Sequence, residues 1–145
     1  MNSINSNNTE IETNYSDEYI NLNEDFLAIN KYYYPLKKKK IIKIRNINKI
    51  KLIEMDRMSG KYTFYGFCWK FYWYHLDNKR PQKKYAIIIS EKNNSITIGI
   101  TPNDTQKCFQ VLNYLYNNNV HTKNELMSFN ENQKDIKNIA KKIQL

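Results

Sequence analysis

The residues best suited to chemistry in this chain are few: His75, His121, Cys68 and Cys108. His75 and Asp77 are two positions apart, so they share one face of an extended strand and could pair. A pair is too few for zinc, which takes three or four protein ligands. Cys68 could act as a nucleophile with His75 as its base, but no orienting group or oxyanion donor accompanies them. The sequence therefore predicts that the protein is not an enzyme and has no cofactor or metal.

Both cysteines lie within apolar patterns and show no CxxC or other metal-ligand spacing. This favours buried, reduced thiols in an intracellular protein. The N-terminus opens with polar Asn and Ser rather than with a signal peptide, and no apolar run approaches the roughly 20 residues of a membrane-spanning helix. We expect a cytoplasmic protein that is soluble or peripheral at a membrane.

Positive charge is the strongest feature of the composition. The formal net charge is +9, and residues 31–92 carry seventeen bases against four acids, whereas residues 1–30 carry six acids and no Lys or Arg. Such a balance suits phosphates, anionic lipid headgroups or acidic protein surfaces. The candidate anion-binding residues form two clusters: Lys38, Lys40, Lys43 and Arg45, and Lys79 and Arg80. Alternatively, the lysines reflect the codon bias that also gives many Asn, Ile and Tyr, and they only solvate the domain.

An aromatic stretch, residues 65–74, lies between these clusters. In an extended chain one set of aromatic side chains would face one way and a second set the other: Tyr65, Phe67, Trp69, Phe71 and Trp73, and Phe64, Tyr72 and Tyr74. A strand covered on both sides, a strand with an exposed aromatic face, or a bend at Gly66 would each explain this pattern. We favour the bend. Whether the aromatic residues are core or an exposed patch stays open.

The elements that must position these residues are mostly strands. β-Prone runs predict strands at 26–34, 41–45 and 49–55, and a hairpin that joins 84–90 to 95–100 through Asn93 and Asn94. Residues 101–104 read as a helix start, with Thr101 as N-cap, Pro102 at N1 and Asp104 at N3. An apolar stripe follows it, and residues 117–119 are expected to end this helix.

Three segments follow from this order. Residues 1–24 form an acidic, Asn-rich leader that we expect to be disordered, because it has too little apolar surface to offset ordering. Residues 25–119 form one domain. Residues 120–145 form an appendage with one short amphipathic helix over 136–143.

The motifs of the middle segment resemble those of pleckstrin-homology-like (PH-like) domains of an uncharacterised group that includes bacterial ones. The residues that carry the resemblance are Tyr33-Tyr34-Pro35, Ile44 and Ile47, Tyr65-Gly66-Phe67 with Trp73, Asp77 through Pro81, and above all Ile98 through Asp104. The resemblance covers residues 30–117 and implies a mainly β (α+β) fold. That fold is a two-sheet sandwich or barrel of six to seven antiparallel strands, capped by one C-terminal amphipathic helix. Lys40, Lys43 and Arg45 also match the Lys-rich turn and Lys-x-Arg strand of phosphoinositide-binding PH domains.

We expect a binding module. A protein-binding scaffold ranks first, an anionic-lipid or phosphoinositide-binding membrane adaptor second, and a single-stranded nucleic-acid binder third, since aromatic rings can stack on bases while lysines follow the backbone. The charge map also predicts self-masking, in which the acidic leader folds back on the basic turn at residues 37–40.

Overall fold

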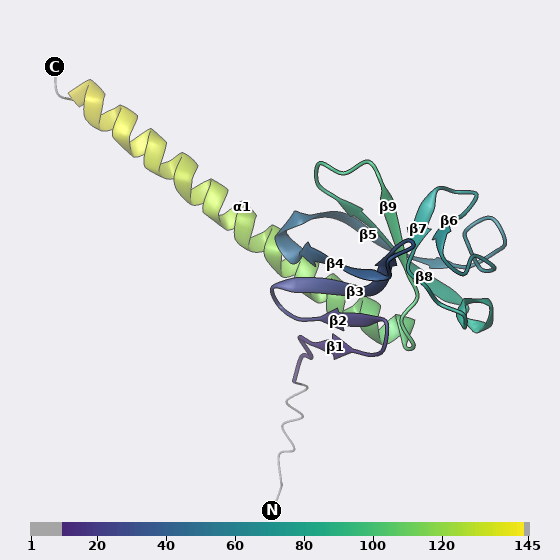
Figure 1. Cartoon of the computed structure of the whole chain (residues 1–145). Coiled ribbons are helices and arrows are strands. Elements are labelled where there is room, and N and C mark those ends of the chain that lie inside the picture. Colours follow the sequence, from purple (N-terminus) through teal and green to yellow (C-terminus); the bar gives the residue numbers. More distant parts are fainter. Residues whose placement is uncertain (1–9, 144–145) are drawn as a thin grey trace, which may run out of the picture.

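The computed structural model describes residues 10–143, except for the side chains of residues 121–123 and 142–143. Two β-sheets pack with one long C-terminal helix in an α+β architecture, and the sheets do not close into a barrel (Figure 1). The predicted two-sheet arrangement with a C-terminal helix is confirmed at this level. The described residues form nine strands, not six or seven, and one of the pairings is parallel.

The first sheet holds four antiparallel strands in sequence order: β1 (Tyr15–Ser16), β2 (Ile20–Leu22), β3 (Phe26–Tyr33) and β4 (Lys38–Lys43). Tyr15, Ile20 and Leu22 are buried, and Asp17 Oδ1 accepts hydrogen bonds from the backbone N–H groups of Tyr19 and Ile20. The predicted disordered leader, residues 1–24, is therefore wrong from Tyr15 on. Residues 1–9 lie outside the described residues.

The second sheet holds five strands in the order β5-β8-β9-β7-β6: β5 (Ile47–Glu54), β8 (Tyr85–Glu91), β9 (Thr97–Ile100), β7 (Tyr72–Tyr74) and β6 (Gly66–Phe67). Only β7 and β9 are parallel among the described pairings. The predicted hairpin is confirmed, because β8 pairs antiparallel with β9 and Asn93 takes a φ of 59° in the turn. Two short 3₁₀ helices, η1 (Ile44–Asn46) and η2 (Arg80–Gln82), lie in the connections.

The aromatic stretch forms two short strands instead of one. Gly66 has a φ of 95°, which agrees with the bend expected there. The chain then reverses between Phe67 and Tyr72, and β6 and β7 pair antiparallel. The tight reversal places Trp69 and Phe71 on a loop instead of on a sheet face.

The core has two parts. The larger lies between the two sheets and the first turns of the helix, and includes Ile29, Ile42, Ile98 and Leu112. The smaller packs around Tyr74 and comprises Met55, Cys68, Tyr74, Ala86 and Ile88. A Cβ at Gly60 or Gly99 would come within 2.4 Å of the Tyr74 ring, so only glycine fits at either position. Both cysteines are buried and free, as predicted.

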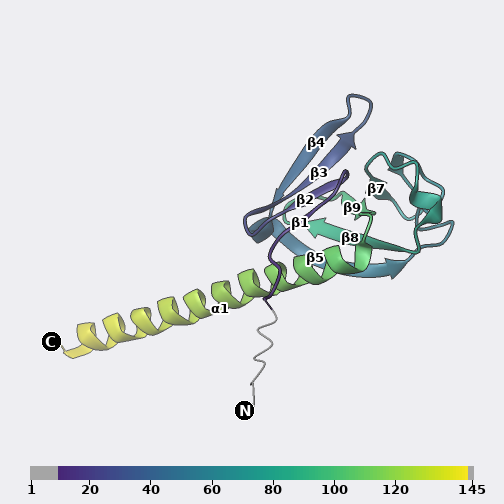
Figure 2. The ribbon, with the colours of Figure 1, turned by 90° about the horizontal axis from the view of Figure 1, so that it is seen from below.

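The helix α1 runs from Thr105 to Ile143. Asp104 caps its start, since Asp104 Oδ1 accepts from the Lys107 N–H at 3.1 Å; the predicted N-cap, Thr101, is wrong. The predicted end at residues 117–119 is also wrong, and residues 136–143 belong to this same helix. Beyond the sheets α1 projects from the body (Figures 1 and 2). No helix in the described part of the chain is long and apolar enough to span a membrane.

Candidate binding surface

One end of the molecule exposes a cluster of large apolar side chains, which we call the aromatic end. It is built from the β3–β4 turn and from residues 58–71. Trp69 and Phe71 are each 76% exposed. The other members are also exposed: Tyr33, Tyr34, Leu36, Met58, Tyr62, Phe64 and Phe67. Exposed apolar patches on soluble proteins mark binding sites when they are large, so this end of the molecule is the candidate binding surface.

Hydrogen bonds and ring contacts hold the two segments together. Trp73 Nε1 donates to the Tyr32 carbonyl at 2.9 Å, and the Tyr65 hydroxyl donates to the Tyr33 carbonyl. The Tyr34 and Tyr65 rings meet edge to face with centroids 5.2 Å apart. Segments more than thirty residues apart in the sequence thus form one preorganised surface.

The loop that carries Trp69 and Phe71 has an unusual backbone. Phe71 has a φ of 60°, a left-handed conformation that bulky residues rarely adopt. Its N–H donates to the Cys68 carbonyl at 2.9 Å, and the Lys70 N–H donates to the Met58 carbonyl at 3.2 Å. The fold therefore holds two large rings out into solvent at a local cost in backbone strain, which is typical of functional positions.

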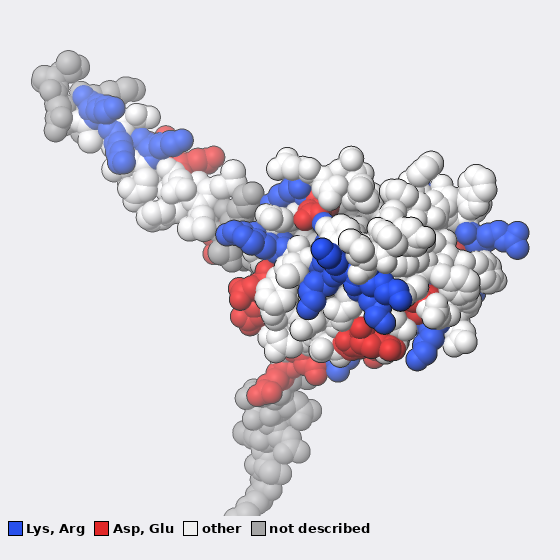
Figure 3. Space-filling model, in the orientation of Figure 1, with Lys and Arg blue, Asp and Glu red and all other residues white. Residues whose placement is uncertain are grey.

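Lysines lie beside the aromatic end. Lys37, Lys38 and Lys39 are exposed in and after the β3–β4 turn, next to Leu36, which is 70% exposed. Lys70 stands between Trp69 and Phe71 on the loop. Figure 3 shows basic side chains gathered over the end of the β3–β4 hairpin, beside an uncharged area over β6 and β7. The surface combines exposed rings with positive charge.

The structure disperses the six predicted anion-binding residues. Lys38 is exposed beside the aromatic end, whereas Lys40 pairs with Glu91 at 3.1 Å. Lys43 and Arg45 are exposed near the junction of the two sheets. Within the first cluster Lys40 thus has an internal acidic partner, while Lys43 and Arg45 line one pocket together, and the anion site stays a prediction.

The second basic cluster is occupied by internal partners. Lys79 Nζ lies 3.6 Å from Glu18 Oε1, and Arg80 is fully buried. Arg80 as an anion-binding residue is wrong: its guanidinium donates to Thr101 Oγ1 and to the carbonyls of Thr63 and His75, and it stacks 4.5 Å from the Tyr74 ring centroid.

The predicted self-masking contact also differs from the observed one. Glu12 pairs with Lys107 at 3.3 Å, and Glu18 pairs with Lys79. The ion pairs formed by acids within residues 10–24 thus involve α1 and the segment before η2, not the basic turn.

Arg80 belongs to a buried polar network that sequence reasoning missed beyond the His75 and Asp77 pair. Asp77 Oδ2 accepts from Lys83 Nζ and from Thr101 Oγ1, both at 2.7 Å. Burial alone would raise the pKa of Asp77, but these hydrogen bonds from Lys83 and Thr101 outweigh it, and the pKa is lowered. The carboxylate is therefore charged and held by buried donors.

His75 is neutral in this network. Its Nε2 accepts a hydrogen bond from the Thr101 backbone N–H at 3.0 Å, so the ring proton is on Nδ1, which lies 3.2 Å from the Leu76 carbonyl. Burial, followed by the charge of Arg80, lowers the pKa of His75. Both histidine nitrogens are occupied, so His75 is poorly placed to act as a base or a metal ligand.

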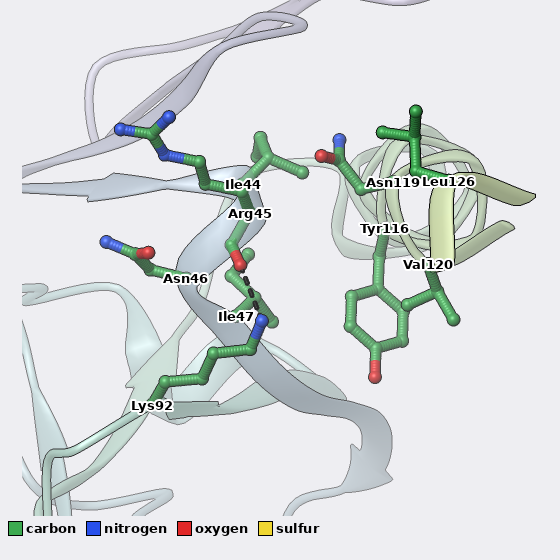
Figure 4. A pocket seen from close by; sticks show the side chains of 9 residues that line it. All are labelled: Ile44, Arg45, Asn46, Ile47, Lys92, Tyr116, Asn119, Val120 and Leu126. Carbon is green, nitrogen blue, oxygen red and sulfur yellow. Dashed lines mark hydrogen bonds between the residues drawn. The ribbon is translucent and has the colours of Figure 1, made fainter. Parts of the chain in front are cut away.

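A groove of about 480 Å³ lies where α1 leaves the body. Ile44, Ile47 and Val120 line it, while the Lys92 ammonium donates to the Arg45 carbonyl at 2.8 Å and the Arg45 side chain points away from α1 (Figure 4). The groove is mainly apolar and does not gather the predicted lysines.

Within the described residues, no group of three or more His, Cys, Asp and Glu side chains could hold a metal ion. The side chain of His121 lies outside the described part of the chain. Comparison with protein-family models, with curated proteins and with solved structures finds no match for this chain.

Proposed function

We propose that the protein is a noncatalytic, PH-like binding module whose aromatic end contacts an anionic membrane surface. The observations that support this most directly are the loop that carries Lys70 between Trp69 and Phe71, each 76% exposed, and the β3–β4 segment, which exposes Leu36 and three lysines. Aromatic rings favour the interfacial region of a bilayer, and lysines beside them are attracted by anionic headgroups.

The lysines are the reason to favour a membrane over a protein partner. Lysine is depleted at the buried centre of protein interfaces, whereas each lysine near an anionic leaflet contributes about 1 kcal/mol. The 69–71 loop and the β3–β4 turn also suit insertion into a bilayer, because a bilayer needs no groove that matches their shape.

The test is cosedimentation of the full-length chain with vesicles of phosphatidylcholine alone or with added phosphatidylserine. We expect binding to the anionic vesicles at low salt that weakens as salt is raised. Trp69→Ser/Phe71→Ser should reduce the partition coefficient by more than tenfold, because two rings no longer leave water. Lys37→Ala/Lys38→Ala/Lys39→Ala should reduce binding to anionic vesicles by roughly a hundredfold.

A matched control is Ile11→Ser/Met127→Ser. These side chains are 61% and 54% exposed, and neither belongs to the aromatic end. The control should bind as wild type does. Equal loss in both double variants, or wild-type binding by Trp69→Ser/Phe71→Ser, would contradict the proposal. A third vesicle set containing a phosphoinositide separates headgroup recognition from general attraction to charge.

A protein partner at the same surface is the second candidate. The edge-to-face packing of Phe67 on Trp73, with centroids 4.8 Å apart, and of Tyr34 on Tyr65 fixes these rings before binding, as in the anchors that dominate protein interfaces. If no vesicle binds at low salt, a photo-cross-linking amino acid at position 69 should give a discrete adduct with one protein in cells, and the same group at position 127 should not. A discrete adduct with RNA would favour single-stranded nucleic acid instead.

A further inference from the structure

The outer part of α1, residues 124–143, exposes large apolar side chains, of which Leu126 also lines the groove where α1 leaves the body. Leu126, Phe129, Ile136 and Ile139 are between 58% and 60% exposed, and every described side chain from 124 to 141 is exposed. Both views show this part of the helix projecting away from the sheets (Figures 1 and 2). Helices in water owe most of their stability to packing of an apolar face, so this segment lacks its packing partner.

The exposed apolar residues continue a face that is already used inside the protein. Cys108 and Leu115 are buried against the sheets and are seven residues apart; Phe129 and Ile136 follow at 14 and 21 residues after Leu115. A seven-residue spacing returns to nearly the same side of a helix. Because a straight helix drifts by about 20° per heptad, the outer stripe begins near the buried face of the inner helix and turns gradually away from it. An apolar stripe with this spacing suits packing against another helix.

The charges along the outer helix indicate which helix could pack against its apolar stripe. Its first half, residues 124–133, carries the acids Glu125 and Glu131 and no base, whereas its second half carries Lys134, Lys137 and Lys141 against the single acid Asp135. A parallel copy would place acids against acids. An antiparallel copy would place the acidic half of each helix against the basic half of the other.

We infer that residues 124–143 pair with the same segment of a second copy of this chain, in antiparallel orientation, through the stripe of Leu126, Phe129, Ile136 and Ile139. The contact is self-complementary, as a twofold interface must be. The paired segments overlap over about 30 Å, the length of 20 helical residues. This interface shares no residue with the aromatic end, so the dimer and the membrane contact can be tested independently.

The test is sedimentation equilibrium of the full-length chain over a range of micromolar concentrations. Wild type should change from 17.5 kDa to twice that mass as concentration rises. Phe129→Glu/Ile136→Glu should remain a monomer at every concentration. Both side chains are exposed, so the body should unfold at the wild-type temperature. A wild-type monomer at the highest concentration, or a dimer in this variant, would overturn the inference.

Met127→Glu is the control on the same helix. Met127 is 54% exposed but lies about 180° around the helix from Ile136, so its substitution should leave the dimer intact. Orientation is tested by charge reversal. Lys137→Glu/Lys141→Glu should weaken the dimer at low salt, and adding Glu125→Lys/Glu131→Lys should restore it. In a parallel pair the first reversal would only replace one like-charge contact by another, so an unchanged dimer would refute the antiparallel arrangement.

Discussion

His75 shows how one buried side chain can make the stability of the whole fold depend on pH. The Thr101 N–H donates to Nε2, so a proton at Nε2 would face another donor. Protonation of Nε2 therefore requires that this hydrogen bond breaks and that the buried site around the ring opens. In the unfolded chain the same ring titrates near its ordinary pKa of 6.5.

The direction of this pH dependence follows from the difference between the pKa of His75 in the folded and in the unfolded chain. Because the pKa of His75 is lowered in the folded state, the unfolded chain binds one more proton below about pH 6.5, and stability falls as pH decreases below that value. The slope from this group approaches about 1.4 kcal/mol per pH unit. Chemical denaturation between pH 4.5 and 8 should show it, and His75→Asn should be less stable but flatter over this range. An equal slope in the variant would contradict this role. The pH range of this experiment lies above 3.8, the ordinary pKa of Asp77. Because the pKa of Asp77 is lowered in the folded state, protonation of Asp77 destabilises the fold only at lower pH.

Residue types alone could not reveal this network. Lys79 and Arg80 read as anion ligands because they are adjacent bases in a turn, but the groups that bind Arg80 come from Thr63 and Thr101, 17 and 21 residues away. The sequence did indicate a pair between His75 and Asp77. It could not show that both side chains would be buried by the chain on either side.

At the scale of elements, β-prone composition predicted several strands well, and alternation of apolar and polar residues predicted one more. The β-prone runs became β3, β5 and β8, and the alternating run at residues 95–100 became β9. The chain reversal at residues 68–71 was not predicted, because the aromatic stretch is apolar on both faces of an extended chain. Its two-residue periodicity therefore gave no sign of where the strand ends. The helix outran its predicted end because neither Gly nor Pro follows Pro102, and asparagine alone is a weak terminator.

The start of α1 gives a direct test at this scale. Asp104→Ala removes the acceptor for the Lys107 N–H and should lower the free energy of unfolding by about 1 kcal/mol. Gln106→Ala, an exposed change in the first turn, should have little effect. Thermal or urea unfolding of the two variants would decide, and a larger loss for Gln106→Ala would mean that Asp104 is not the cap.

The whole molecule includes a segment that composition alone assigned to a disordered leader. Tyr15, Ile20 and Leu22 contribute to the main core, and Asp17 accepts a hydrogen bond from the Asn103 N–H just before α1. Three apolar residues among so many polar ones were too sparse to predict this, because their contacts come from residues far along the chain. The N-terminal strands thus belong to the same folded unit as the helix.

Deleting residues 1–24 should therefore unfold the protein instead of exposing a basic site. Burial of three large side chains stabilises by roughly 1.5 to 3 kcal/mol each, which is comparable to the total stability of a small domain. Circular dichroism and amide spectra of the truncated chain should show loss of cooperative unfolding. Deletion of residues 1–9 keeps every contact described here and should preserve the transition; a cooperative, native-like fold without residues 1–24 would contradict this role.

The continuity of α1 has a geometric consequence. Its inner turns are fixed against the sheets through Leu112 and Leu115, so the direction in which its outer stripe faces is set by residue count alone. Each residue inserted or removed near 118–120 would rotate the stripe by about 100° and shift it by about 1.5 Å. An insertion or deletion of seven residues at this point would therefore leave the stripe on nearly the same side of the helix. A change of two residues would turn the stripe to nearly the opposite side.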